Sequence, residues 1–369
     1  MTKTSFHSAE ETFWHSVGVH ALFFPLSRWV QPPNNGGGAD TSDSKRRLVN
    51  LMDTSGLSKQ LRRPEAVPAT TEDLLRVHGK AYLDAFKKAS DAGGGELGTF
   101  APFSVGGYEI AALSAGLALQ AVDDVMSGAS RNAYALCRPA GHHCLPNEPM
   151  GFCLLANIPI AIEHAIAKRG LKRVAVVDWD VHHGNGTQSI FYDRSDVLTI
   201  SIHQENCFPP GYTGEQDVGT GAGTGFNCNI PLPAGSGHQT YIEAMEKIVV
   251  ARLEAFKPEL IIVASGLDAS AVDPLARQLL TSESYRAMTR IMMTSADKLC
   301  KGRLAVVHEG GYSEAYVPFC GHRIIEQLSG VKTEVEDPEL EFFSSWQPSP
   351  KVQAFQSQFV DDLRRLLVV

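Results

Sequence analysis

The chain has 369 residues, of which 43% are hydrophobic and 20% are charged, a composition typical of a soluble globular protein rather than of a disordered or fibrous one. Its length accommodates one large domain or two medium ones. The formal net charge of -8 argues against non-specific binding to nucleic acid or to an anionic membrane surface.

The N-terminus and the cysteines bear on the compartment. Glu10 and Glu11 stand where a signal peptide would be basic, and "VGVHALFFPL" (17–26) is too short and too interrupted to span a bilayer. The seven cysteines are scattered, and no two form a CxxC pair, so they indicate neither a disulfide framework nor a cysteine zinc site. We therefore expect an unexported, cytoplasmic protein with no nucleic-acid or membrane partner.

Segments rich in Pro, Asn, Gly and Asp predict surface loops over 31–44 and 91–103. From about residue 106 onward, short apolar runs alternate with longer helical patterns, of which the clearest cover 156–170 and 281–302. Five runs are apolar enough to predict buried parallel strands, and they begin at Ala133, Arg173, Val197, Leu260 and Arg303. We expect one α/β domain over 1–369, with a mainly parallel sheet flanked by helices, a core over about 70–330 and both terminal extensions packed on it.

Polar clusters follow all five predicted strands. They are "RPAGHHC" (138–144), "DWDVHHGNGT" (178–187), His203, "LDASAVDPL" (267–275) and "EGGYS" (309–313). In open α/β sheets the ligand lies outside the carboxyl ends of the strands. The sequence therefore predicts a single composite site.

The residues after the second strand predict a metal site. In an extended chain, alternate residues share a face, so Asp178, Asp180 and His182 would point the same way. Asp180 and His182, joined by Asp268 from the fourth strand end, give three N/O ligands and an open position, which is the catalytic zinc pattern. Each residue alone is more often a turn residue or a satisfied core group, so the interpretation depends on their grouping.

Two histidines and a tyrosine predict the accompanying chemistry. Gly141 supplies a turn in which His142 and His143 can converge on one ligand. The sequence has no GxSxG motif, so a metal-activated water with histidine acid/base help is simpler than acyl-enzyme chemistry. Tyr312 follows two glycines and could donate to an oxyanion, although a tyrosine there is commonly an ordinary loop residue.

Together these motifs resemble the histone deacetylase family, in particular its class II-like members and the bacterial histone deacetylase-like amidohydrolases. The matching segments also include "GFC" (151–153), "ISIHQ" (200–204), "CFPPG" (207–211) and "NIPLPAGSG" (229–237). Weaker likeness extends from "RVHGKAYL" (76–83) to "IIEQLSG" (324–330), so most of the chain is covered. The resemblance implies an arginase/deacetylase-type α/β fold and an acylated lysine or small acyl amide as substrate.

The resemblance also implies roles for individual residues. Zn²⁺ would be held by Asp180, His182 and Asp268, with His142 and His143 as the acid/base pair, Tyr312 polarising the acyl carbonyl and Asp178 orienting His142. Structural K⁺ would occupy two sites, one formed by Asp178, Ser201 and Ile202 with the main chain of Asp180 and His182, the other by Phe191, Arg194, Val197 and Phe226. The acyl-lysine stem would pass a channel lined by Gly151, Phe152 and Phe208, with Gly310 and Gly311 also at the substrate.

Departures from family patterns refine the expected substrate. Position 185 is Asn, where class I members carry an Asp beside the second histidine, and this should make His143 less basic. Leu275 stands where polyamine deacetylases of the family use an acidic gatekeeper, which favours acetyl-lysine-like or other neutral amides over acetylpolyamines. Glu96 is a candidate for the acidic residue that would clamp the substrate from the loop over 91–103.

We expect hydrolysis of an acyl amide to acetate and free amine, with no covalent intermediate. A non-catalytic acyl-lysine-binding pseudo-deacetylase would be expected to have lost a metal ligand or the tyrosine, and all are kept. A manganese ureohydrolase of the arginase type would need two adjacent metals, whereas one Asp-His-Asp set is evident. Because bacterial relatives are often oligomeric, a dimer or tetramer is also expected, with 31–44 or the tail beyond Val331 as candidate interfaces.

Overall fold

The computed structural model describes residues 3–16, 20–21, 24–25 and 39–368. Seven strands form one sheet in which every neighbouring pair is parallel. In spatial order they are β1 (Ser5–His7), β6 (Asn132–Ala135), β11 (Leu304–His308), β10 (Leu260–Ser265), β7 (Val174–Asp178), β8 (Val197–Gln204) and β9 (Asn227–Leu232). The five predicted strands are confirmed, and the two edge strands, β1 and β9, were not predicted.

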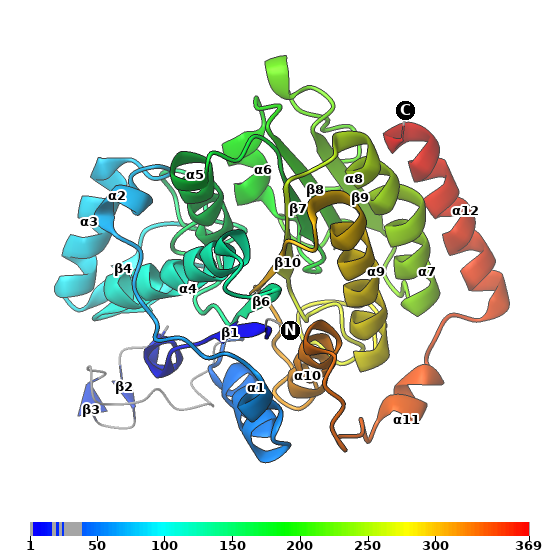
Figure 1. Cartoon of the computed structure of the whole chain (residues 1–369), viewed down its shortest axis with the longest axis horizontal. Coiled ribbons are helices and arrows are strands. Elements are labelled where there is room, and N and C mark those ends of the chain that lie inside the picture. The colour runs from blue at the N-terminus through cyan, green and yellow to red at the C-terminus, as the bar shows by residue number, and fades with distance from the viewer. Residues whose placement is uncertain (1–2, 17–19, 22–23, 26–38, 369) are drawn as a thin grey trace.

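Helices cover both faces of this sheet (Figure 1). The α-helices are α1 (Asp43–Thr54), α2 (Thr71–Leu74), α3 (Lys80–Asp91), α4 (Gly107–Ser127), α5 (Asn157–Arg169), α6 (Asn185–Phe191), α7 (His238–Ala244), α8 (Val250–Phe256), α9 (Ser282–Cys300), α10 (Val317–Ser329), α11 (Leu340–Ser344) and α12 (Pro350–Leu367). Short 3₁₀ turns cover Glu10–Trp14, Leu57–Gln60 and Gly221–Gly223, and a π-helical turn, Met245–Val249, joins α7 to α8. The two predicted helices correspond to α5 and α9.

Side-chain alternation divides the core into two layers. In β10, Ile261 and Val263 join the cluster that includes residues of α9, α10 and α12, whereas Leu260, Ile262 and Ala264 join the cluster under α4 and α5. Each fully buried Val, Leu or Ile contributes about 1.5–3 kcal/mol relative to an exposed one. The sheet is therefore covered on both faces, which explains its continuous apolar strands.

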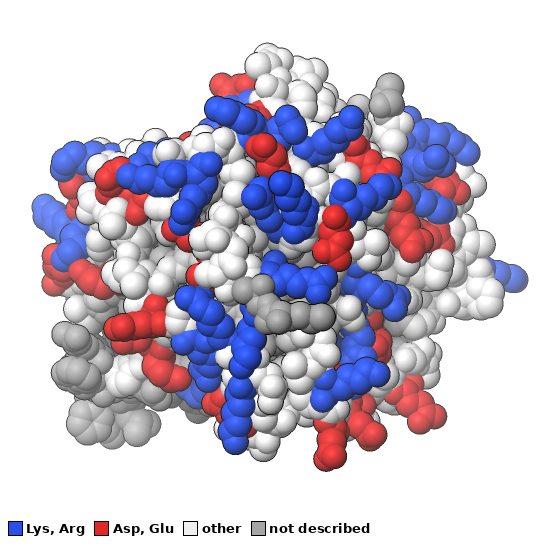
Figure 2. Space-filling model, in the orientation of Figure 1, with Lys and Arg blue, Asp and Glu red and all other residues white. Residues whose placement is uncertain are grey.

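Residues near both ends of the described chain join this core. Phe6 and Phe13 from the N-terminal segment and Val360 from α12 belong to the same buried cluster. Helix α4 is long and apolar enough, by length and composition, to cross a membrane, but 56% of its most apolar window is buried inside the fold, as in a core helix. Basic and acidic side chains are interspersed over the face shown in Figure 2.

Two loop predictions need correction. The segment 91–103 begins at the last residue of α3 and contains β4 (Gly94–Glu96) and the first two residues of β5 (Pro102–Ser104), which pair antiparallel. Its glycines gave the appearance of a loop, although backbone pairing needs no side chain. Of the segment 31–44, residues 31–38 lie outside the described residues, and 43–44 begin α1. Most of "VGVHALFFPL" also lies outside them, apart from 20–21 and 24–25, which pair as β2 (His20–Ala21) and β3 (Phe24–Pro25).

Candidate active site

The carboxyl ends of β7, β10 and β11 lie side by side and bring the predicted site together. Asp178 closes β7 and pairs in register with Ala264 of β10, whose next residue, Ser265, pairs with His308 of β11. Because all three strands are parallel, the segments that leave them start from the same edge. The polar clusters that follow therefore converge, as the sequence predicts.

Asp180, His182 and Asp268 form a buried cluster. His182 Nδ1 lies 3.1 Å from Asp180 Oδ1 and 3.2 Å from Asp268 Oδ2. One ligand atom from each of the three residues lies within 4.8 Å of the others. Burial lowers the pKa of His182, but hydrogen bonds to Asp180 and Asp268 outweigh it and raise that pKa well above its usual value. The cluster therefore favours a positive charge at its centre.

The donor atoms of this cluster fit a metal ion. Asp180 Oδ2 accepts the Gly310 N–H at 2.8 Å and Asp268 Oδ1 accepts the Val181 N–H at 2.9 Å. The buried Asp268 Oδ2 faces His182 Nδ1 at 3.2 Å and, within the part of the chain that the structure describes, has no other polar partner. A Cβ at Gly310 would lie 2.1 Å from that same oxygen, so the space beside it requires glycine. Two carboxylates and one imidazole supply three N/O donors, the number that catalytic metal sites commonly take from the protein.

His142 and His143 stand beside this cluster with their rings 3.9 Å apart between centroids. His142 Nδ1 lies 3.0 Å from Asp178 Oδ2, and His143 Nδ1 lies 2.6 Å from Asn185 Oδ1. Because oxygens face both Nδ1 atoms, each Nδ1 carries a proton and each Nε2 remains for substrate. His142 Nε2 lies 3.8 Å from Asp180 Oδ2.

The two imidazoles differ in basicity. Burial lowers the pKa of His142, but Asp180 and Asp178 outweigh it and raise that pKa to about 10. Burial, followed by the charges of His142 and His182, holds the pKa of His143 well below its usual value. The expected weak basicity of His143 therefore has burial as its main cause, since the hydrogen bond to Asn185 acts in the opposite direction. At neutral pH, His142 is charged and His143 neutral.

Tyr312 lies next to the Asp180–His182–Asp268 cluster. Its backbone N–H donates to Asp273 Oδ2 at 2.9 Å, and its ring centroid lies 6.3 Å from that of His182 and 5.8 Å from that of Phe152. The preceding Gly311 has φ +124°, a conformation that L side chains rarely adopt. Burial and then Asp268 and Asp180 raise the pKa of Tyr312 well above its usual value. Its hydroxyl therefore stays protonated at neutral pH and can donate a hydrogen bond.

Aromatic residues frame the approach to these groups. The Phe208 ring centroid lies 4.9 Å from that of His143 and 6.4 Å from that of Phe100. Gly151 has φ +53°, and a Cβ there would lie 2.5 Å from His143 Cδ2 and 3.0 Å from Phe208 Cε1. Glycine is thus required where the chain passes the histidine. Phe100, which is 62% exposed and was not predicted, extends this aromatic wall outward.

Comparisons with known proteins agree with this geometry. A family model described as "Histone deacetylase domain" matches residues 40–328. The chain is 56% identical to a histone deacetylase-like amidohydrolase of Pseudomonas aeruginosa over 361 residues, covering 98% of this chain and 95% of that protein. A probable deacetylase of Archaeoglobus fulgidus is 38% identical over 305 residues, covering 80% and 84% of the two chains. This chain belongs to the histone deacetylase family.

The fold agrees with a solved member of the family. The crystal structure of the HDA15 HD domain superposes with a TM-score of 0.84 at 28% identity, covering 99% of this chain and 96% of that one. The expected arginase/deacetylase-type α/β fold is therefore confirmed. The division into one domain over 1–369 stays a prediction.

Two expected specificity residues of this histone deacetylase family chain lie on its surface. Leu275 is 37% exposed, and its backbone N–H donates to Asp273 Oδ1 at 2.9 Å, so Asp273 links it to the Tyr312 segment. Glu96 is exposed, and its Oε1 accepts the Ala101 N–H at 3.2 Å within its own β4–β5 hairpin. That bond gives Glu96 a local structural role beside the predicted one.

The residues of the expected K⁺ sites lie around β8. In the first set, Asp178 is in register with Ser201, which precedes Ile202, and Ser201 Oγ is 3.0 Å from His203 Nδ1. In the second set, the Phe226 carbonyl accepts from Thr199 and the Phe191 carbonyl accepts from Arg194, both at 3.0 Å, close to Val197 at the start of β8. Ion binding at either set stays a prediction.

His183 points away from the metal cluster. Its ring stacks on that of Tyr212, with centroids 4.2 Å apart, and its Nε2 lies 3.0 Å from Gln188 Oε1. His183 is therefore a packed, hydrogen-bonded neighbour of the cluster.

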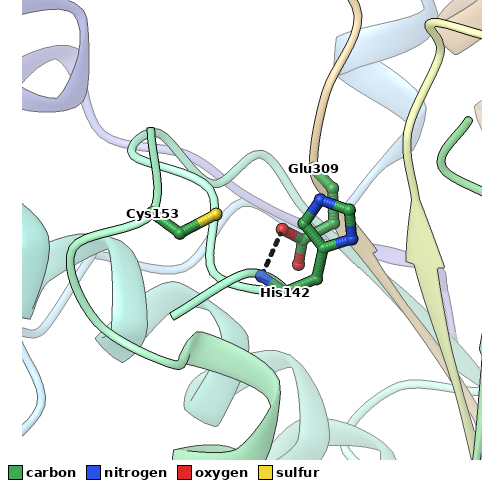
Figure 3. Close-up of side chains that lie close together, drawn as sticks. All are labelled: His142, Cys153 and Glu309. Carbon is green, nitrogen blue, oxygen red and sulfur yellow. Dashed lines mark hydrogen bonds between the residues drawn. The ribbon is translucent and has the colours of Figure 1, made fainter. Parts of the chain in front are cut away.

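Sequence reasoning missed two buried acids, Asp273 and Glu309. Asp273 anchors the Tyr312 backbone, and burial, followed by Asp268, raises its pKa to about 7. Glu309 Oε2 accepts the N–H groups of Gly141 at 2.7 Å and His142 at 3.0 Å, and Figure 3 shows the second of these bonds. The available signal was an acid placed directly after an apolar strand, in "AVVHEGGY" (305–312), where a charge would otherwise be costly.

Proposed function

We propose that this chain is a zinc-dependent deacetylase that hydrolyses the acyl amide of acetyl-lysine-like substrates to acetate and free amine. The observation that carries the proposal is the meeting of the Asp180–His182–Asp268 cluster with a charged and a neutral imidazole and the Tyr312 side chain. The relatives named above are a deacetylase-like amidohydrolase and a probable deacetylase. The chain is a hydrolase acting on linear amides, and zinc and substrate class are the proposed refinements.

Zn²⁺ at Asp180, His182 and Asp268 would polarise the acyl carbonyl and make a neighbouring water more acidic. Neutral His143 takes the proton of the attacking water at Nε2 as the water oxygen bonds to the acyl carbon. Tyr312 donates its hydroxyl hydrogen bond to the oxyanion that forms, and charged His142, held by Asp178, stabilises the same negative charge. The His143 imidazolium returns the proton to the amine nitrogen as the C–N bond breaks.

The approach to the site supports a neutral, extended substrate. The Phe152 and Phe208 rings and the bare backbone at Gly151 suit the methylene stem of an acylated lysine. Leu275 offers no charge to a substrate ammonium, which favours acetyl-lysine-like amides over acetylpolyamines. We extend the proposal to structural K⁺ at the two sets around β8 and to a cytoplasmic, homo-oligomeric enzyme.

A substrate panel tests the proposal. Zinc-loaded and chelator-treated protein are assayed against acetyl-lysine peptides, acetylpolyamines and longer acyl amides, with metal content measured on the same samples. We expect one zinc per chain and zinc-dependent acetate release, greatest from acetyl-lysine peptides. Binding of acetyl-lysine peptides without turnover would support the non-catalytic reader instead. Two Mn²⁺ per chain with urea release from guanidinium substrates would support a ureohydrolase.

A further inference from the structure

Three consecutive backbone N–H groups of the histidine turn point at two buried side chains. Gly141 and His142 donate to Glu309 Oε2 at 2.7 and 3.0 Å, and His143 donates to Cys153 Sγ at 3.5 Å. Figure 3 shows Glu309 and Cys153 beside the His142 main chain, each coming from a different segment. The turn that carries the acid/base pair is therefore held by its main chain as well as by its rings.

Other contacts fix the opposite side of this turn. The His142 carbonyl accepts the N–H groups of Gly186 at 3.0 Å and Thr187 at 3.1 Å, both in the first turn of α6. A Cβ at Gly141 would lie 2.6 Å from the backbone nitrogen of Asn157, so the turn packs tightly against the start of α5. Glu309 therefore closes the one side of the turn that faces β11.

Burying Glu309 at this position lowers the stability of the fold. Its side chain is buried, and within the described part of the chain its Oε1 has no hydrogen-bond partner. A buried, half-satisfied carboxylate costs stability, and each such group in a native protein calls for an explanation. Packing does not supply one, because an apolar side chain would cover the same space without that cost.

A second metal site is the competing explanation. Ligand atoms of His142, Cys153 and Glu309 lie within 4.8 Å of one another. However, His142 Nδ1 faces Asp178 Oδ2 at 3.0 Å and its Nε2 faces Asp180 Oδ2 at 3.8 Å, so neither ring nitrogen is free to join Cys153 and Glu309 around a cation. The pattern of donors therefore favours a group that accepts from the main chain over one that binds a metal.

We propose that Glu309 is a positioning residue, which holds the His142–His143 turn against the metal cluster by accepting two of its backbone N–H groups. Removing these bonds frees the turn on its β11 side and lets both imidazoles shift together. A displacement of about 1 Å at a catalytic group can lower a rate by about 10²-fold. The kinetic part of this inference rests on the proposed deacetylase function, whereas the structural part does not.

Amide hydrogen exchange tests the structural part. In Glu309→Ala, exchange at residues 141–142 should become at least about tenfold faster, since each of these N–H groups loses its hydrogen bond to Glu309 Oε2. Glu309→Gln keeps a carbonyl acceptor and should retain most of the protection. A matched control is Glu259→Ala: Glu259 Oε2 accepts the N–H groups of Lys172 and Arg173 at 2.6 and 3.2 Å, where the chain enters β7. That variant should change exchange there and leave 141–142 unaltered.

Kinetics and metal content test the rest. With zinc bound, Glu309→Ala should lower kcat by about 10²-fold and leave KM within about threefold, because the channel residues lie on other segments. Glu309→Gln should recover kcat to within about tenfold of wild type, and Glu259→Ala should match wild type. If Glu309→Ala does not fold, Glu309→Asp carries the test, since its carboxylate is one methylene short of the turn and should lower kcat where Gln does not.

Three results would overturn the proposal. One is wild-type kcat in Glu309→Ala, another is unchanged exchange at 141–142, and the third is a second metal equivalent that wild type holds and Glu309→Ala loses. Faster exchange in Glu309→Ala, combined with a wild-type protein inactive on every acyl amide, would refute the proposed function and leave the structural inference standing.

Discussion

Asp178 bridges His142 and the metal cluster with its two oxygens. Oδ2 lies 3.0 Å from His142 Nδ1, while Oδ1 accepts the backbone N–H of Asp180 at 3.0 Å. Asp178→Asn keeps the shape but removes the negative charge that supports the His142 imidazolium. We expect kcat to fall by about 10²- to 10⁴-fold, the scale of losing an acid/base group. Steady-state kinetics with Asp297→Asn, a surface carboxylate paired with Arg131, as control will check this.

Tyr312→Phe removes the hydroxyl donor and leaves the ring. We expect kcat to fall by about 10²- to 10³-fold, the scale of one oxyanion donor, with metal content unchanged. Tyr241→Phe is the control, because it removes a hydroxyl that is buried in the core and has no hydrogen-bond partner in the described chain. Near wild-type turnover in Tyr312→Phe would remove the tyrosine from the mechanism.

Asn185→Asp tests the role of His143 through pH. A carboxylate at 2.6 Å from His143 Nδ1 stabilises the imidazolium more than an amide does, so the pKa of His143 rises. Less neutral base is then present at acidic pH. The acidic limb of the kcat/KM profile should move upward by about one pH unit. An unchanged acidic limb would mean that another group accepts the proton.

Zinc should stabilise the folded chain, because it neutralises the buried Asp180 and Asp268 carboxylates. A ligand at 100 times its Kd adds about 2.7 kcal/mol to the free energy of unfolding. Thermal unfolding with and without Zn²⁺ measures this as a rise in Tm of several degrees. In Asp268→Asn, zinc should no longer raise the Tm. A Tm of the wild-type protein that is the same with and without zinc would count against the site.

Gly310→Ala should abolish metal binding without replacing any of the three proposed ligands. The added Cβ would lie 2.1 Å from Asp268 Oδ2 and 2.7 Å from Asp180 Oδ2, within the space that the ion requires. Gly128→Ala, at a helix end with no atom within 4 Å of the new Cβ, is the control and should cost only modest stability. Full zinc content in Gly310→Ala would place the ion elsewhere.

The sequence predicted the five central strands and the meeting of the residues that follow them, because strand ends in a parallel sheet share an edge. It missed β1 and β9, since "SFH" is too short and "NCNIPL" too mixed to stand out from loops. Asp273 and Glu309 were missed for another reason. Both act on the backbone of a distant segment, Asp273 on Tyr312 and Glu309 on Gly141 and His142, and no spacing along the chain reveals such a bond.

The basicity of His143 shows the same limit. The residue beside it, Asn185, was identified correctly as its neighbour, yet the main lowering of its pKa comes from burial and from His142 and His182. These influences depend on how densely the three imidazoles pack. The sequence motif predicts the contact between Asn185 and His143, but it does not predict how deeply His143 is buried or which charges surround it.

The register of β7 between β10 and β8 has a consequence for how this protein can change. Asp178 sits opposite Ala264 and Ser201, and side chains along a strand alternate between faces. A slip of one residue would exchange the valines of β7 between the two core layers and turn Asp178 away from His142 in the same movement. The same register therefore fixes both the core packing of β7 and the position of Asp178. A change of register that misplaced Asp178 would also lower the free energy of unfolding.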